Sequence, residues 1–582
     1  MTYGSNKGRN RRDFMGLAGM AALGGTTAAL TGSLTTSALA ASSDPGKADL
    51  VVTNARVITV DAQTPRAEAF AVKDGRFMAV GTTDAMKGLI GRGTETFDAK
   101  GMTITPGFID CHNHAEDAGK ILRNEVILGN PYAPERMSIA SIQDKLRAKA
   151  AKTAPGIWVE GFFYDDTKAL DGRPLNVADL DAVSKDLPVV VYHGGGHSAY
   201  YNSKALEMAG ITKNTPNPAG GTFDHDAKGA LNGRATDNAM DIVNKTVKRP
   251  VLTPEEELRR DRDAVAFISK EFVRFGVTSV AHQDGNLTAL QQVRESGQLL
   301  HRVNYEADPD VIDAFIAAGI RTGFGDEWIR LGATFEHICD GSFEERTMSR
   351  KTPFAGSNPP YYGNITTTQE DLNAWAERLQ RAGIECNCHA NGIPAIEMVL
   401  TAYERALKLA PRPNVRHKIT HCTNINDDIV RRIKASGVVP NSFTVYLYTD
   451  AEKFHLYGED FLNQCMAFRT WMDAKVPVAT GTDYPPGSFD PRISIQSMVT
   501  RKGWNGETWG ARQRINLDEA LLINTMHGAY YMHEEAIKGS ITPGKLADFV
   551  VMAGDLHAVD PDRIKDIPIV RTFVGGTAVY SA

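Results

Sequence analysis

One stretch decides how this chain folds. It reads Ile104-Thr105-Pro106-Gly107-Phe108-Ile109-Asp110-Cys111-His112-Asn113-His114-Ala115-Glu116-Asp117. An apolar run leads into two histidines, His112 and His114, and side chains at i and i+2 of a β-strand point to the same face. Two imidazoles that converge at a strand end form half of a transition-metal site, for which zinc is the commonest occupant. The alternative is a chance surface pair, so other parts of the chain must supply the remaining ligands.

Length and composition describe an ordinary globular protein. The chain has 582 residues, of which 42% are hydrophobic and 23% charged. This length suggests one large domain with additions, or two to three domains. The net charge of −6, with no basic cluster beyond the N-terminus, argues against nucleic acid as a partner. Six cysteines in a chain this long do not predict a disulfide framework.

The first 40 residues have the pattern of an export signal. Paired arginines, Arg11 and Arg12, precede an apolar run from Gly16 to about Leu34, and Ala38-Leu39-Ala40 offers a cleavage site. The arginine pair resembles a twin-arginine signal, whose partner is the twin-arginine export machinery. We therefore expect a periplasmic or secreted protein without a stable membrane anchor after cleavage. A permanent anchor is the alternative, but Gly, Thr and Ser interrupt the run.

Both ends of the remaining chain read as short strands. Residues 48–81 contain two β-rich runs joined by Asp74-Gly75, a strong hairpin signal. Similar runs occupy 547–552 and 570–580. These patterns predict one small β-domain built from residues 48–103 and 537–582.

Residues 104–536 alternate apolar strand-like runs with amphipathic helical stretches, which is typical of a parallel sheet or barrel. The predicted strands are Thr105–His112, Val277–Gln283, Arg302–Glu306, Ile329–Glu336, Ile384–His389, Lys418–His421, Val438–Asn441 and Val476–Asp483. Eight strands are the number needed to close a barrel. The interval of about 115–275 is too long for an ordinary connection, so we expect an inserted subdomain there that covers the barrel mouth. Its predicted elements are a strand at 188–192 and helices near 138–152 and 255–275.

Metal-capable residues stand at the ends of five of these eight strands. They are His112 with His114, Glu336, His389, His421 and Asp483. Active sites of such barrels lie at the C-terminal ends of the strands, so all these side chains are expected at one end. Chance could place one or two there but hardly five. The alternative for each residue is a buried, hydrogen-bonded side chain without a metal, and for Glu336 a core carboxylate paired with His or Arg.

At this point the chain resembles the amidohydrolase superfamily, and within it the amidohydrolase family 3 or YtcJ-like branch, which includes N-substituted formamide deformylases. The resemblance rests on motifs spread over nearly the whole chain. They are Pro106–His114, His197–Leu206, Gly276–Val280, Asp340-Gly341-Ser342, His389–Gly392, Arg416–His421, Gly481–Pro485, Gly539-Ser540-Ile541 and Gly544–Asp548. It implies an α/β protein with a (β/α)₈ TIM barrel, a composite β-sandwich and one or two divalent metal ions, zinc above all.

The resemblance also implies a role for each ligand. His112 and His114 would bind the more buried metal ion, and His389 and His421 the second. Relatives often carry a carbamylated lysine that bridges the metals four residues before the Asp-Gly motif, where this chain has Glu336. A glutamate offers the same two oxygens, although a single zinc ion stays open. Asp483 would contact a metal and act as the general acid/base.

These parts predict hydrolysis of a non-peptide carbon–nitrogen bond in a small organic amide, N-acyl or N-formyl compound. A bound divalent metal ion yields hydroxide at neutral pH, and Asp483 would pass the proton to the leaving group. Ester or lactone hydrolysis by the same site is one alternative, and a catalytically silent binding protein is another. Two departures from the family pattern, Ile393 and Thr420, put a standard family substrate in doubt.

Three further polar residues are candidates for substrate contacts: His197, His282 and Asp340. For each the alternative is a structural role, in a turn, in the core or in the Asp-Gly-Ser loop. Strand parity turns the thiols of Cys111, Cys386, Cys388 and Cys422 away from the histidine face, so we interpret them as packing residues. The substrate, the native metal and assembly into a homo-oligomer are left open by the sequence.

Overall fold

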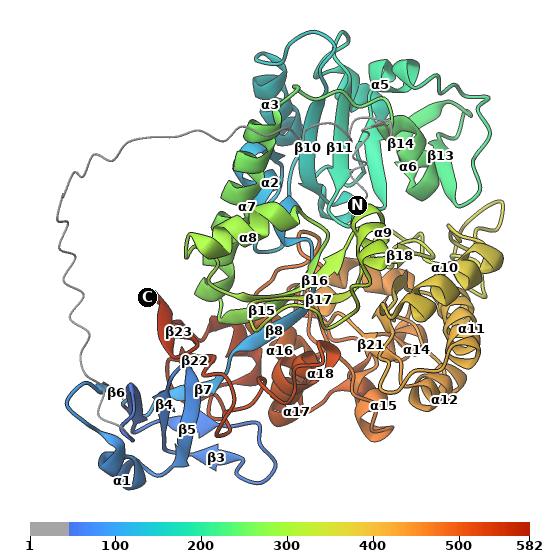
Figure 1. The fold of residues 1–582 in the computed structure, drawn as a ribbon. Coiled ribbons are helices and arrows are strands. Elements are labelled where there is room, and N and C mark those ends of the chain that lie inside the picture. The colour runs from blue at the N-terminus through green and yellow to red at the C-terminus, as the bar shows by residue number, and fades with distance from the viewer. Residues whose placement is uncertain (1–45) are drawn as a thin grey trace, which may run out of the picture.

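The computed structural model describes residues 46–582 (Figure 1). The predicted export signal, residues 1–40, lies outside the described residues. The fold is α/β. Two mainly antiparallel sheets at the base of Figure 1 are built from both ends of the described chain. One has the strand order β5-β4-β1-β6, comprising Arg76–Gly81, Ala69–Lys73, Leu50–Thr53 and Glu95–Asp98. The other has the order β24-β23-β22-β7-β2-β3, comprising Thr577–Ser581, Ile569–Val574, Phe549–Met552, Thr103–Pro106, Arg56–Ile58 and Arg66–Ala67.

The stretch quoted first is not one strand, and in this respect the prediction of a strand at Thr105–His112 is wrong. It divides at Gly107 into β7, which pairs antiparallel with β22, and β8 (Phe108–Asn113), which pairs parallel with β15 (Val277–Gln283). A Cβ at Gly107 would overlap the side chain of Thr278, so only glycine lets the chain pass this close to β15. One continuous run thus joins the terminal sheets to the parallel strands.

Two four-stranded parallel sheets carry the strand ends of interest. The first has the order β17-β16-β15-β8, with β17 at Ile329–Thr334 and β16 at Arg302–Ala307. The second has the order β18-β19-β20-β21, comprising His337–Ile338, Asn387–Ala390, Lys418–His421 and Val439–Asn441. A parallel bridge between Ala333 and Glu385 joins the two sheets.

The eighth predicted strand, Val476–Asp483, is not a regular strand. Only isolated parallel bridges occur near it, Ala479 with Asn441 of β21 and Tyr484 with Asn113 of β8. The Cys111 N–H also donates to the Thr480 carbonyl at 3.1 Å. The pairings therefore run through all eight segments and return to β8.

Helices follow or precede most of these strands and pack around them (Figure 1). The main ones are α2 (Ala115–Asn124), α7 (Pro254–Arg274), α8 (Leu287–Glu295), α9 (Pro309–Ala318), α10 (Gln369–Ala382), α11 (Ile393–Leu409), α12 (Asp427–Ser436), α15 (Phe468–Asp473), α16 (Pro491–Thr500) and α17 (Leu517–Leu522). Thr253 and Glu256 form a capping box at the start of α7. Gly319, Gly383 and Gly437 end α9, α10 and α12 in the left-handed conformation that glycine adopts without strain.

The long interval after β8 folds into a sheet of its own, at the top of Figure 1. Its order is β13-β14-β12-β11-β10-β9, comprising Gly221–His225, Leu231–Thr236, Ser198–Tyr201, Val189–His193, Val159–Tyr164 and Val126–Ile127. Its helices are α3 (Ile139–Ala150), α4 (Val177–Asp181), α5 (Ser203–Met208) and α6 (Asp237–Asn244). The sequence indicated only one strand here, β11; the other five lack its unbroken run of valines, and β9 has only two residues.

The interpretation of Cys111, Cys386, Cys388 and Cys422 as packing residues is confirmed. All six cysteines are buried and free, and burial raises the pKa of the Cys111 and Cys422 thiols. No helix within residues 46–582 is long and apolar enough to cross a membrane.

Candidate metal centre

Six buried side chains converge at the C-terminal ends of the parallel strands. His112 lies in β8, His389 in β19 and His421 at the end of β20. His114 caps α2, and Glu336 lies two residues beyond β17. The sixth, Asp483, follows the bridge at Ala479 in the eighth segment. The structure thus brings together all six residues that the sequence singled out as metal ligands.

Glu336 stands between the histidines with its two oxygens pointing in different directions. Its Oε1 lies 3.7 Å from Nε2 of both His112 and His114. Its Oε2 lies 3.6 Å from Nδ1 of His389, whose ring centroid is 4.1 Å from that of His421. One carboxylate therefore faces two separate sets of imidazoles.

Asp483 faces the same space from the other side. Its Oδ1 lies 3.1 Å from Nε2 of His112 and 3.2 Å from Nε2 of His114. Its Oδ2 lies 3.8 Å from Nε2 of His421. Both His421 and Asp483 have positive φ values, 68° and 54°, which non-glycine residues adopt mainly at turns and functional sites.

These residues fit a divalent metal ion. Ligand atoms about 2.1 Å from a tetrahedral zinc ion stand about 3.4 Å apart, close to the spacings around Glu336. Glu336 Oε2 and His389 Nδ1 are buried and have no hydrogen-bond partner in the described part of the chain, yet they face each other. Two groups of ligand atoms are close enough to hold an ion, and they share Glu336: His112 with His114, and His389 with His421.

The electrostatics favour a cation here. Burial opposes ionisation of Glu336, but neighbouring histidines, above all His112, hold its pKa well below the usual value. Burial likewise opposes ionisation of Asp483, whose pKa is also held low by His112 and His114. Burial would lower the pKa of His112, and the two carboxylates raise it to about 9. Both carboxylates thus carry their negative charge at neutral pH and attract positive charge.

Packing against the Phe443 ring and the buried carboxylate of Asp110 position the ligands. The rings of His112 and His421 lie against Phe443. The centroid of the Phe443 ring is 5.3 Å from that of His112 and 4.8 Å from that of His421. Asp110 accepts hydrogen bonds from the His112 N–H at 3.2 Å and from the Thr482 N–H and Oγ1 at 3.0 and 2.6 Å. It therefore ties the strand of His112 to the segment of Asp483. Asp110 shares strand parity with His112 and His114, a signal that could have identified it.

Tyr446 is a second residue that sequence reasoning missed. It lies in α13 (Val445–Thr449), is buried, and its hydroxyl donates a 2.5 Å hydrogen bond to Asp483 Oδ2. Its ring is also stacked against that of His421, at 6.3 Å and 16°. Nothing in the local sequence marks this tyrosine, since it lies in a stretch that reads as a connection after the seventh predicted strand.

The three candidates for substrate contacts lie in different surroundings. The His197 ring lies 4.7 Å from the ring of His389, and its Nδ1 contacts Asp237 at 2.7 Å. Burial lowers and Asp237 raises the pKa of His197, which settles at about 9. His282 is the penultimate residue of β15, is buried, and burial lowers its pKa to about 4.

Both carboxylate oxygens of Asp340 accept hydrogen bonds from neighbouring segments of the chain. Its Oδ1 accepts the Asn391 N–H at 2.8 Å. Its Oδ2 accepts the Gly392 N–H at 2.9 Å, and the Ser349 N–H and hydroxyl at 2.9 and 2.8 Å. Both oxygens are thus used by the protein itself. The geometry favours the structural alternative for Asp340, which holds the loop after β19.

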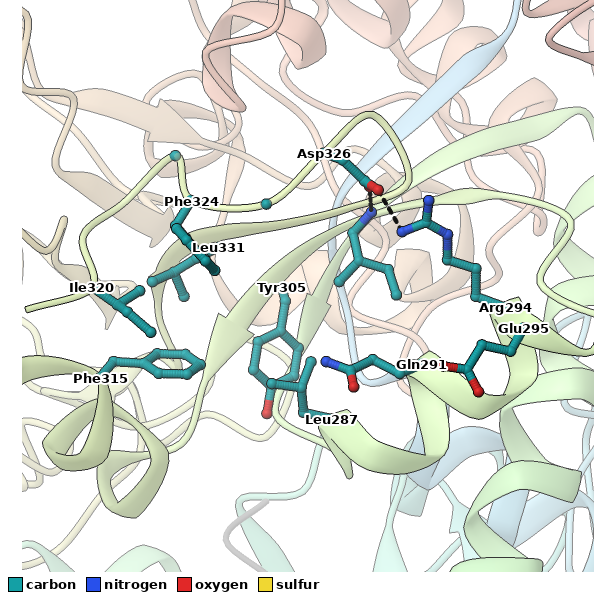
Figure 2. A pocket seen from close by; sticks show the side chains of 13 residues that line it. Leu287, Gln291, Arg294, Glu295, Tyr305, Phe315, Ile320, Phe324, Asp326 and Leu331 are labelled. Carbon is teal, nitrogen blue, oxygen red and sulfur yellow. Dashed lines mark hydrogen bonds and ion pairs between the residues drawn. The ribbon is translucent and has the colours of Figure 1, made fainter. Parts of the chain in front are cut away.

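A more voluminous pocket lies away from the six ligands. It has a volume of about 1080 Å³ and opens between α8, α9, β16 and β17. Figure 2 shows Tyr305 among the lining side chains and Arg294 paired with Asp326, where the two side chains are 2.6 Å apart. The pocket shares no residue with the six ligands, so its size does not indicate the site of the chemistry.

Comparison with known proteins supports this geometry. A profile of the amidohydrolase family matches residues 95–580. The chain is 26% identical to the putative amidohydrolase YtcJ of Bacillus subtilis, covering 90% of this chain and 98% of that protein. It is 24% identical to the N-substituted formamide deformylase of Arthrobacter pascens, covering 91% and 98%.

A solved structure has the same fold. It is an uncharacterized metal-dependent hydrolase from Pyrococcus horikoshii, 22% identical, with a TM-score of 0.67 over 88% of this chain and 99% of that one. The sequence-based resemblance to the YtcJ-like branch is thereby confirmed. This chain belongs to the amidohydrolase family and is a hydrolase of carbon–nitrogen bonds.

Proposed function

We propose that this protein is an exported, zinc-dependent amidohydrolase that cleaves a non-peptide carbon–nitrogen bond of a small organic amide. His112, His114, Glu336, His389, His421 and Asp483 would hold one or two ions. The observation that carries this proposal is the placement of Glu336, whose two oxygens face two separate sets of histidines.

We also infer that the eight paired segments form a (β/α)₈ barrel. The return of the pairings to β8 through the bridges of Ala479 and Tyr484 supports this architecture. In this architecture residues 48–103 and 537–582 are the composite β-sandwich, and about 115–275 is the insertion over the barrel mouth. The ligands then lie at the end of the barrel where such enzymes place their active sites.

A bound divalent ion supplies Lewis acidity for the substrate carbonyl and lowers the pKa of a water molecule from about 15.7 toward roughly 7. The chain's own residues complete the reaction. Asp483 accepts the proton of the attacking water and delivers it to the leaving nitrogen. The Tyr446 hydroxyl holds Asp483 Oδ2, so that Oδ1 stays directed toward the histidines. Asp110 fixes the segment of Asp483 relative to His112.

Metal content tests the ligand set. Purified protein supplemented with zinc should carry about two equivalents, the occupancy of a two-metal site, and Glu336→Ala should lose at least one of them. His112→Ala should lose the ion held with His114. Glu404→Ala, a change on the outer face where Glu404 pairs with Arg432, serves as a matched control. Near-zero metal in the unaltered protein would contradict the proposal.

A substrate panel tests the reaction. N-formyl, N-acyl, lactam and lactone compounds of similar size are incubated with the zinc-loaded protein, and new amine and acid are both quantified. Release of amine from N-formyl or N-acyl compounds is expected. Turnover of lactones alone would replace the amide assignment by lactone hydrolysis.

Export is tested in the cell. The paired arginines and the cleavage pattern at Ala38–Ala40 support transport by the twin-arginine machinery. We expect mature protein in the exported fraction with an N-terminus near residue 41. Arg11→Lys with Arg12→Lys should leave the precursor inside the cell, and unchanged export of this variant would refute the route.

A further inference from the structure

A second cluster of ionisable side chains lies between the inserted sheet and the parallel strands. Nine side chains form this cluster, which we call the acidic cluster. Its members are Asp165, Asp166, Glu344, Glu345, Asp450, Lys168, Lys453, Arg346 and His193. They come from the ends of β10 and β11, the loop after β18, and the chain after α13. None of them belongs to the ligand set described above.

The chain's own cations neutralise the acidic cluster only in part. Lys453 Nζ lies 3.2 Å from Asp165 Oδ2, 3.3 Å from Glu344 Oε1 and 3.4 Å from Asp450 Oδ1. Lys168 also contacts Asp165, at 2.5 Å. The five carboxylates meet two lysines and one arginine, and His193 adds a fourth positive charge when protonated. With every carboxylate ionised, the acidic cluster keeps at least one negative charge in excess.

Three carboxylate oxygens in the acidic cluster have no hydrogen-bond partner within residues 46–582: Glu344 Oε2, Asp450 Oδ2 and Asp166 Oδ1, the last of which lies 3.6 Å from His193 Nε2. Glu344 is 4% exposed and Asp450 1% exposed. Buried oxygens of this kind are costly unless a donor reaches them. Burial first, and then the Asp450 carboxylate, raises the pKa of Glu344 to about 7. The surroundings of Glu344 therefore favour the arrival of positive charge.

A small cavity reaches Glu344; Lys168, which is paired with Asp165, also lines it, whereas Asp450 does not. It has a volume of about 60 Å³, and its lining includes Glu344, Asp165 and Gly194. One water needs about 10–15 Å³ on such a scale, so the cavity holds roughly four to six groups of that size. A Cβ on Gly195 would overlap Glu345 Oε1 and lie 2.9 Å from Glu344 Oε2, so only glycine lets the backbone pass this close to both carboxylates. The cavity can accept an ammonium group with a short alkyl stem.

The cavity lies beside the metal centre. Pro485, two residues beyond Asp483, forms part of its lining. Tyr446, the second residue of α13, contacts Asp483, and Asp450 at the end of this helix follows one turn later, or roughly 5–6 Å along the axis. A substrate whose carbonyl lies among the metal ligands could therefore place another group against Glu344.

We propose that the cavity at Glu344 binds a protonated amine of the substrate, which makes this enzyme selective for amides that carry a cationic group. This inference rests on the proposed hydrolase function and names its substrate class. A metal ion is the competing occupant, since Asp165, Glu344 and Asp450 lie close enough to hold one. However, Lys453 already contacts these three carboxylates, through Asp165 Oδ2, Glu344 Oε1 and Asp450 Oδ1. Only the outer oxygens are open, and an ammonium group needs no closed shell of ligands.

Turnover is the first test. Zinc-loaded enzyme is given two N-formyl compounds of equal length, one that ends in a primary ammonium and one that ends in a methyl group. We expect kcat/KM for the cationic compound to exceed that for the neutral one by about 10- to 100-fold, the usual effect of a buried charge-assisted hydrogen bond. Glu344→Gln should abolish most of this preference and retain activity on the neutral compound. Glu404→Gln, which removes one equal charge on the outer face, should leave the preference unchanged.

Binding without turnover is the second test, and it separates this inference from the proposed function. Calorimetric titration with butylammonium and with neutral 1-butanol is carried out on the full protein and on Glu344→Gln. Only butylammonium should bind the unaltered protein, and Glu344→Gln should weaken it at least about tenfold. Equal binding of both probes, or an unchanged preference in the variant, would overturn the inference. An additional equivalent of zinc that Glu344→Gln loses would assign the site to a metal instead. Absence of hydrolysis with intact butylammonium binding would refute the hydrolase proposal alone.

Discussion

The metal centre and the acidic cluster are both buried groups of carboxylates and histidines, but they balance their charge differently. At the metal centre Glu336 and Asp483 face four imidazoles, and within residues 46–582 neither carboxylate forms an ion pair with a lysine or an arginine. In the acidic cluster, lysine ammonium groups already lie between the carboxylates. A site that lacks its own cation is suited to a metal ion, whereas one that is nearly neutralised can at most select a single additional charge.

The largest expected effect is on kcat, and it concerns Asp483, the proton acceptor of the metal centre. Asp483→Asn removes the proton acceptor and should lower kcat by about 10²- to 10⁴-fold, with little change in thermal stability. Steady-state kinetics of the zinc-loaded protein measure this. The control is Asp473→Asn, whose side chain is 69% exposed. Activity of Asp483→Asn within a factor of about ten of the parent would contradict the acid/base role.

The free energy of unfolding of a Lys453 variant tests how far the acidic cluster depends on this internal cation. Lys453→Ala leaves Asp165, Glu344 and Asp450 without their shared ammonium, and removing one partner of a buried ion pair costs about 3–5 kcal/mol. Chemical denaturation followed by circular dichroism measures the free energy of unfolding. Lys408→Ala, an exposed change on α11, is the control and should cost less than about 0.5 kcal/mol. Equal stability of the two variants would show that the acidic cluster does not depend on Lys453.

The raised pKa of Glu344 should make the free energy of unfolding depend on pH. The pKa of Glu344 is raised to about 7 in the folded protein, so the folded state binds this proton more tightly than the unfolded state. This contribution is fully present below the unfolded pKa of about 4.3 and is lost as pH rises through 7. Glu344→Gln has no titrating proton at this position, so its stability does not include this pH-dependent contribution. We therefore expect the variant to gain stability relative to the parent between pH 5 and pH 8, by roughly 1–3 kcal/mol. A constant difference across this range would contradict the raised pKa.

The smallest expected effect concerns the link between the two regions, Tyr446. Tyr446→Phe removes the 2.5 Å hydrogen bond to Asp483. A hydrogen bond to a charged group contributes about 1.5–3 kcal/mol, so kcat should fall about 10- to 100-fold while metal content is retained. Tyr448→Phe, on the same helix and half-buried, is the matched control. Loss of metal in Tyr446→Phe would instead make the tyrosine a support of the ligand geometry.

Strand parity and strand ends were readable from the sequence because they are local. A period of two residues placed His112 and His114 on one face and turned Cys388 and Cys422 away from it. The strand Val277–Gln283 was predicted with the bounds that the structure shows, and so was Lys418–His421. The break at Gly107 was not predicted, because it depends on the approach of Thr278 from a strand 171 positions away.

The sequence by itself therefore determined the family, the α/β class and the six residues that converge on the metal centre. Only the tertiary structure decided how they face one another. Asp110 contacts Thr482 across 372 positions, and the hydroxyl of Tyr446 reaches Asp483 across 37. The two-sided placement of Glu336 and the open oxygen of Glu344 likewise depend on which distant strands and loops become neighbours. Periodicity reports the face on which a side chain lies, but a partner hundreds of residues away is specified only by packing.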